Sequence, residues 1–186
     1  MASISLKYKS KQGNLTAPGD VDPGAMIPIA TTTVGSGGAA NVEFTSIPST
    51  YTHLQIRIFT SATSNTSGAI QINGNTTVTN YWTHTLLGNG SSASATAYNN
   101  TYVPYYTSTG SNYGASIIDI LDYTSTSKLK TLRVLGGYDA NGSGYVFLQS
   151  LNFNSTSAVT SIKLLIDGST NWNQHSHFAL YGILAA

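Results

Sequence analysis

Short runs in which apolar and polar side chains alternate fill the sequence from about Val42 onward, and they constrain the fold more than any other feature. In HLQIRIF (53–59), the apolar residues at 54, 56 and 58 alternate with polar residues at 55 and 57, which is typical of a half-buried strand. The other predicted strands are VEF (42–44), AIQIN (69–73), YWTHTLL (81–87), ASIIDIL (115–121), LKTLRVL (129–135), GYVFLQSL (144–151), SIKLLI (161–166) and HSHFALYGI (175–183). No helical period competes, so the sequence predicts an all-β, two-sheet sandwich of about eight to nine antiparallel strands, a jelly roll or another Greek-key arrangement.

The connecting segments support this fold class. They are rich in Gly, Asn, Ser and Asp, which supply positive φ angles and local side-chain to backbone hydrogen bonds. Asn141-Gly142 is the strongest hairpin signal. The low-complexity stretch from Gly88 to Gly114 is expected to be one long loop, and loops of that length usually serve a function or pack on a neighbour.

Few side chains carry charge, which excludes several classes of partner. Charged residues make up 8% of the chain and the formal net charge is +1. Such a chain has no field to attract nucleic acid or an anionic membrane, and no apolar run approaches the roughly 20 residues that span a bilayer. Cysteine is absent, so disulfides and cysteine-based zinc sites are impossible. We therefore expect neither nucleic acid nor membrane as a partner.

Residues 1–40 differ from the rest and are expected to form an extended N-terminal arm, with the β-sandwich domain spanning residues 41–186. Prolines and glycines recur in this segment and apolar residues are sparse. The side chains expected to bind a partner, by lying in its grooves or by adding a strand to a neighbouring sheet, are Lys7, Tyr8, Lys9, Lys11, Leu15, Met26 and Ile27. The three lysines alternate with other residues, so a strand here would present three ammonium groups on one face, suited to an acidic patch. A solvated tail without function is the alternative.

Three separated motifs resemble a family of virion proteins of tailed bacteriophages. They are SIPSTYTHLQIRIF (46–59), GNGSS (88–92) and the closing FALYGI (178–183), and the resemblance covers roughly residues 44–183. It implies a location in the virion. Small jelly rolls of this kind serve as capsid decoration (cement) proteins, commonly trimeric, or as receptor-binding modules of tail fibres.

Two pairs of side chains are candidates for catalysis or metal binding. Asp119 and Asp122 could be an acid/base pair, but a separation of three puts them on opposite faces of a strand, with Asp119 facing solvent and Asp122 in the following turn. His175 and His177 form an H-x-H on one face of the last predicted strand, yet no third ligand is visible nearby. We therefore expect no catalytic residues, no metal, no cofactor and no enzymatic activity.

Loop aromatics complete the set of candidate sites. Tyr102, Tyr105, Tyr106 and Tyr113 could contact another subunit, stack on sugar rings or simply pack within the fold, and Trp82 and Trp172 lie elsewhere in the sequence. The expected function is that of a capsid decoration protein on the surface of the virion, a homotrimer whose partner is the major capsid protein. The alternative is a tail-fibre or tailspike module that binds host glycan.

Overall fold

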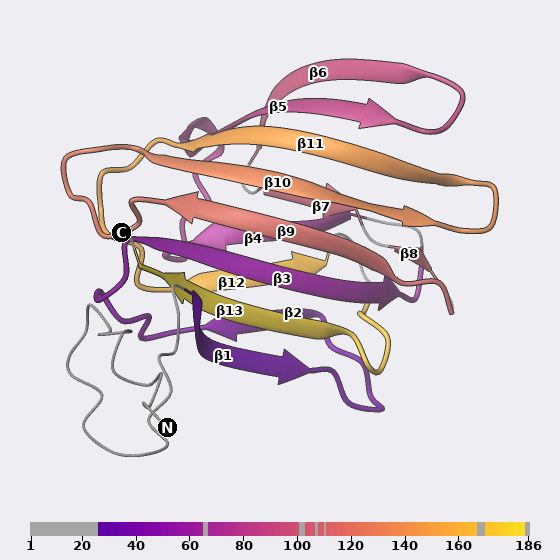
Figure 1. The fold of residues 1–186 in the computed structure, drawn as a ribbon, viewed down its shortest axis with the longest axis horizontal. Helices are drawn as coiled ribbons and strands as arrows, with labels where there is room; N and C mark the ends of the chain where they lie inside the picture. Colours follow the sequence, from indigo (N-terminus) through magenta and orange to yellow (C-terminus); the bar gives the residue numbers. More distant parts are fainter. Residues whose placement is uncertain are drawn as a thin grey trace, which may run out of the picture.

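The chain folds into two packed sheets whose strands pair antiparallel except for the short parallel pair of β3 (His53–Ala62) and β8 (Ser108–Thr109), which confirms the predicted all-β sandwich of jelly-roll type (Figure 1). A computed structural model describes residues 26–64, 67–100, 103–106, 108–109, 111–166 and 170–184. The larger sheet has the order β1 (Met26–Thr33), β13 (His177–Ile183), β3 (His53–Ala62), β9 (Gly114–Leu121), β10 (Lys130–Asp139), β11 (Gly144–Phe153), β5 (Tyr81–Gly88) and β6 (Ala93–Asn100), and the short β8 (Ser108–Thr109) pairs with β3. The smaller sheet has the order β2 (Asn41–Phe44), β12 (Ile162–Ile166), β4 (Ser67–Ile72) and β7 (Val103–Tyr106).

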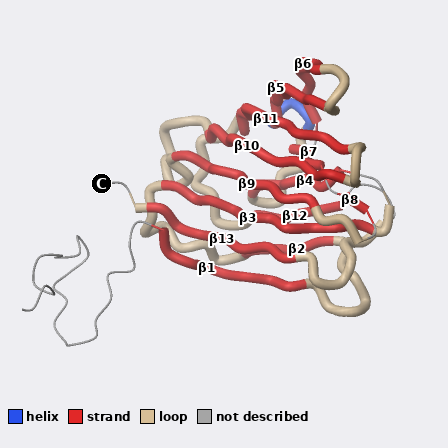
Figure 2. Tube along the Cα trace, turned by 45° about the vertical axis from the view of Figure 1, so that its right-hand side comes forward, coloured by secondary structure: helices blue, strands red, loops and turns tan. Residues whose placement is uncertain are grey.

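Each of the nine predicted stretches contains a strand. The alternation in β3 works as expected, because Leu54, Ile56 and Ile58 are buried while Arg57 is exposed. The β10–β11 hairpin turns at Asn141 and Gly142, whose φ angles of 60° and 102° are the positive values that such a turn needs. Figure 2 shows how strands dominate the described part of the chain, whose one helical element is the three-residue 3-10 turn Val78–Asn80.

One expectation about the connecting segments is wrong. The stretch from Gly88 to Gly114 is not one loop, since it contains β6, β7 and β8. Strand β6 was missed because alanine is the apolar residue that alternates with Ser and Thr in it, too small to signal a buried face, whereas an unbroken register of eight residue pairs with β5 holds it in the sheet.

The sandwich begins at Met26 rather than near residue 41. Strand β1 pairs with β13, and in this register Met26 lies opposite Ile183 and Ile27 opposite Gly182. Both residues were expected in a partner-binding arm, and they belong instead to the edge of the larger sheet, where they are half-buried. The other expected arm positions, Lys7, Tyr8, Lys9, Lys11 and Leu15, lie outside the described residues.

The core lies between the two sheets and includes several residues of the stretches 46–59 and 178–183. Ile47 is buried, and the hydroxyl of the buried Tyr123 donates to the carbonyl of Pro48. The ring of Tyr51 covers Gly182 so closely that a Cβ atom there would lie 2.2 Å from it. The first and last motifs therefore contact each other, and these motif residues act through packing.

Candidate docking surface

The outer face of the larger sheet exposes a row of large aliphatic side chains. The strand register places Ile117 of β9, Leu135 of β10, Leu148 of β11 and Leu86 of β5 side by side, and we call these four residues the aliphatic row. They are 38%, 55%, 50% and 54% exposed. The residues next to them in sequence, such as Ile118, Val134 and Phe147, are buried against the smaller sheet, which lies behind the larger one in Figure 1, so this row is on the face away from the core. Val146 of β11, two residues before Leu148, is 60% exposed on the same face.

A second row, next to the first, is polar. The register aligns Gln55, Asp119, Arg133, Ser150 and His84 across five strands, and we call them the polar row. At one end the Gln55 Nε2 atom donates to Asp119 Oδ1 at 2.9 Å. The Arg57 Nε atom donates a hydrogen bond of 3.1 Å to Gln55 Oε1. The Arg57 guanidinium carbon lies 5.6 Å from the centre of the Tyr181 ring. These contacts hold the polar groups at the β3 end of the row in place.

The two rows meet in an open groove at the β5–β6 end of the sheet. Its volume is about 540 Å³, and its lining includes His84, Leu86, Arg133, Leu148 and Ser150. On the β6 side the lining includes Ala95 and Ala97, whose small side chains leave the groove open. Most of the exposed surface of the lining is apolar, although polar residues such as Arg133 and Ser150 also contribute to it, and this mixture is typical of a binding surface.

The chemistry of this face favours contact with protein. Contiguous apolar surface on a regular sheet is unusual in a monomer and marks an interaction site. Aliphatic side chains offer no π face for a sugar ring, but they suit the apolar centre of a protein interface with a polar rim. The arrangement of the two rows matches that pattern.

The loop tyrosines are only partly placed by the structure. Tyr113 stacks on Phe59 with ring centres 4.8 Å apart, and its hydroxyl donates to the carbonyl of Gln174 at 2.8 Å. Tyr105 and Tyr106 pair through their backbone with β4, their side chains are outside the described part of the structure, and Tyr102 is not described at all. Trp172 is fully buried, whereas Trp82 is 49% exposed on the outer face.

The predicted geometry of the histidine pair is wrong. Strand β13 begins at His177, and His175 lies in the preceding turn with a φ angle of 71°. His177 Nδ1 instead forms a hydrogen bond of 2.9 Å with Thr33 Oγ1 on β1. The part of the chain that the structure describes holds no cluster of three or more His, Cys, Asp or Glu side chains that could bind a metal.

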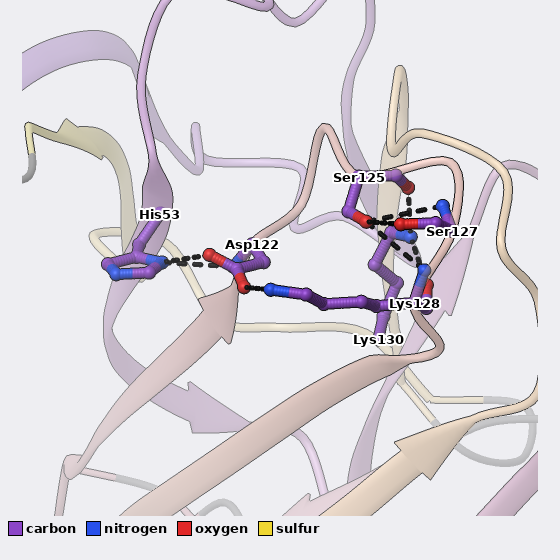
Figure 3. A network of polar contacts seen from close by, with 6 residues as sticks. All are labelled: His53, Asp122, Ser125, Ser127, Lys128 and Lys130. Carbon is purple, nitrogen blue, oxygen red and sulfur yellow. Dashed lines mark hydrogen bonds and ion pairs between the residues drawn. The ribbon is translucent and has the colours of Figure 1, made fainter.

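Asp119 and Asp122 lie where the sequence analysis placed them. Asp119 is in the polar row on β9, and Asp122 is in the turn that follows this strand. Asp122 Oδ2 accepts a hydrogen bond of 2.8 Å from Lys128 Nζ, and Oδ1 lies 3.7 Å from His53 Nδ1 (Figure 3). The hydrogen bond and charge of Lys128 lower the pKa of Asp122. This contact favours the ionised form of the carboxyl group.

The aliphatic row was missed by the sequence analysis, although a signal for it exists. Pairs such as Ile117-Ile118, Leu86-Leu87 and Phe147-Leu148 place apolar side chains at consecutive positions of one strand. Since consecutive residues point to opposite faces, such pairs indicate apolar groups on both sides of the sheet.

Comparison with known proteins gives little further information. No family model matches the sequence, and no curated protein matches it either. Within the described residues, no helix qualifies as a candidate membrane span. Among solved structures, the galectin LEC-6 of Caenorhabditis elegans is similar with a TM-score of 0.37 and 11% sequence identity, over 82% of this chain and 95% of the galectin. A similarity at this level supports no conclusion about function.

Proposed function

We propose that this protein is a non-catalytic structural protein of a tailed-bacteriophage virion that decorates the capsid and stabilises the assembled shell. The observation that carries the proposal is the aliphatic row on the outer face of the larger sheet. The motif resemblance supports the virion context, and the low charge of the chain suits a surface that is desolvated on assembly. The occupant of the outer face is then the major capsid protein.

The size of the surface suggests that several copies act together. Five aliphatic side chains, Val146 and the aliphatic row, are about half exposed, and covering each contributes roughly 1 kcal/mol, or about 5 kcal/mol in total. Association itself costs at least about 4 kcal/mol, so one copy binds weakly. A homotrimer that presents three such faces binds far more tightly, because attachment of the first raises the effective concentration of the others.

Stabilisation of the shell follows from mass action. A protein that binds the assembled shell and not its separated subunits shifts the equilibrium toward the shell. No bond is made or broken in this process, so it needs no catalytic group.

A tail-fibre receptor-binding module is the second candidate, favoured by one observation. Trp82 exposes its indole on the outer face, and the register places Asn152 on one side of it and Asn99 on the other. An aromatic face flanked by amides suits a sugar ring, because the ring stacks while the amides bind hydroxyl groups.

Sedimentation with purified shells that lack this protein separates the two candidates. Leu135→Glu and Leu148→Glu each place a charge in the aliphatic row and should abolish co-sedimentation, whereas Trp82→Ala should not. Asn41→Glu adds the same charge at an exposed position of the smaller sheet and serves as the control. Full binding by both leucine variants would refute the docking surface. Loss of binding to host glycan in Trp82→Ala alone would favour the receptor-binding role.

A further inference from the structure

One sheet edge of this protein lacks the protection that the others have. The two sheets end at β1, β6, β2 and β7. Strand β1 carries Pro28 and a register shift between Pro28 and Ala30, β7 contains Pro104, and β2 is only four residues long and contains Glu43. Proline, irregular pairing, charge and shortness are the features that prevent unwanted pairing of edge strands.

Strand β6 has none of these features. It is eight residues long, contains no proline and no charged residue, and pairs with β5 without a register shift. Residues 93–97 are all exposed, and in the described part of the chain no strand pairs with the other side of β6. A regular, uncharged edge of this kind is a template for another strand.

The side chains next to this edge also leave room for an added strand. Ala93, Ala95 and Ala97 face outward on β6, opposite Gly88, Leu86 and His84 of β5. Two of these alanines line the open groove of about 540 Å³. A strand added to β6 would widen the outer face by one strand. Large apolar side chains on that strand would pack against the alanines and close the groove.

We infer that the β6 edge binds residues 3–11 of a second copy of this chain. The sequence there is SISLKYKSK, in which Ile4, Leu6 and Tyr8 alternate with serine and lysine. In a strand the three large side chains share one face, which fits the row of small alanines. The lysines at 7, 9 and 11 share the opposite face, where their charge prevents pairing of a further strand with the new edge.

The position of β1 indicates a second copy as the donor. Strands β1 and β6 are the first and eighth in the order of the larger sheet, so seven spacings of about 4.8 Å, or roughly 34 Å, separate them. Residues 12–25 could cover this distance only when stretched, since a flexible segment of fourteen residues has a root-mean-square end-to-end distance of about 20 Å. Pro18-Gly19 and Pro23-Gly24 favour turns in this stretch. Donation to a neighbour avoids this path, and repeated head-to-tail donation closes a ring such as a trimer.

This inference goes beyond the virion role and can fail independently of it. Because the chain has no cysteine, single introduced cysteines report contacts cleanly. Full-length Leu6→Cys protein is mixed with full-length Ala95→Cys protein and oxidised mildly. Thr31→Cys replaces Ala95→Cys in the control, since Thr31 is exposed on the same face at the opposite edge of the sheet. We expect cross-linked dimers to form about tenfold faster with Ala95→Cys than with Thr31→Cys, because docking raises the effective thiol concentration.

Sedimentation of the full-length protein provides the second measurement. Leu6→Asp should convert the oligomer to monomer, whereas Lys9→Ser, on the opposite face of the strand, should leave it intact. Cross-linking no faster than in the control would overturn the inference. A variant with both Leu6→Cys and Ala95→Cys provides the test for binding within one chain. If this variant forms an internal disulfide while the two single variants do not cross-link, each chain binds its own segment and the inference is also overturned.

Discussion

Lys130 is a fully buried lysine, and its replacement by methionine is predicted to destabilise the fold strongly. It lies at the start of β10, and its Nζ atom donates to three backbone carbonyls, those of Ser125 at 2.5 Å, Lys128 at 2.9 Å and Thr156 at 3.1 Å (Figure 3 shows Lys130 beside the Ser125 turn). The three bonds join the turn after β9 to the segment after β11. Methionine keeps the aliphatic stem but removes every donor.

The expected loss follows from this hydrogen-bond count. A hydrogen bond to a charged group contributes about 1.5–3 kcal/mol, and each carbonyl left without a donor costs about 1–3 kcal/mol unless water reaches it. Removal of the buried ammonium returns part of its desolvation cost, which is the effect that lowers the pKa of Lys130. The net loss for Lys130→Met should be about 3 kcal/mol, a large fraction of the 5–15 kcal/mol typical of a folded domain.

Urea unfolding followed by tryptophan fluorescence measures this loss, since Trp172 is fully buried. Lys128→Met is the matched control: the same substitution two residues earlier removes a 67% exposed side chain that pairs with Asp122 at the surface. The control should unfold close to the wild-type midpoint. If Lys130→Met were no less stable than Lys128→Met, the three carbonyl contacts would not stabilise the fold and the reasoning would be wrong.

Two further predictions concern stability. Burial raises the pKa of Tyr81 from 10.0 to about 12, so the folded state holds the phenolic proton more tightly than the unfolded state. This contribution to stability is fully present below pH 10 and is lost as the pH rises through 12. Between these pH values the wild-type free energy of unfolding should therefore fall by about 2–3 kcal/mol more than that of Tyr81→Phe. Urea unfolding at pH 10 and at pH 12 measures this difference. Gly182→Ala places a Cβ atom against the Tyr51 ring and should cost at least about 2 kcal/mol, whereas Gly35→Ala, with no atom within 4 Å of the new Cβ, should be nearly neutral in thermal unfolding. Equal melting temperatures for the two alanine variants would contradict the proposed Tyr51 contact.

The sequence predicted the strands whose alternation is driven by burial. Leu54, Ile56 and Ile58 are buried as expected, because large aliphatic side chains at every second position determine which face of a strand meets the core. Strand β6 escaped prediction because its order comes from pairing with β5, a long-range interaction that small polar side chains do not reveal. Residues 26–33 were assigned to the arm for the same reason, since β1 depends on pairing with β13.

The candidate site was harder to predict than the fold. The alternation pattern identifies the buried face of a strand and not an exposed apolar face. In pairs such as Ile117-Ile118 one residue is buried and the other is exposed, and the sequence does not distinguish the two. The prediction that His175 and His177 share one face of a strand was wrong because His175 precedes β13 and has a left-handed backbone conformation. Residues two apart share a face only inside a strand. The stretches 46–59 and 178–183 gave no direct help in finding the site, because the contact between Tyr51 and Gly182 is a packing contact.

An electron-microscopy reconstruction of particles that carry this protein tests the proposed capsid role most directly. If that role is right, two-sheet density lies on the outside of the capsid shell, with the face that carries Leu86, Leu135 and Leu148 turned toward the major capsid protein. Density for this fold at the tail, or on the capsid with that face turned to solvent, would contradict it.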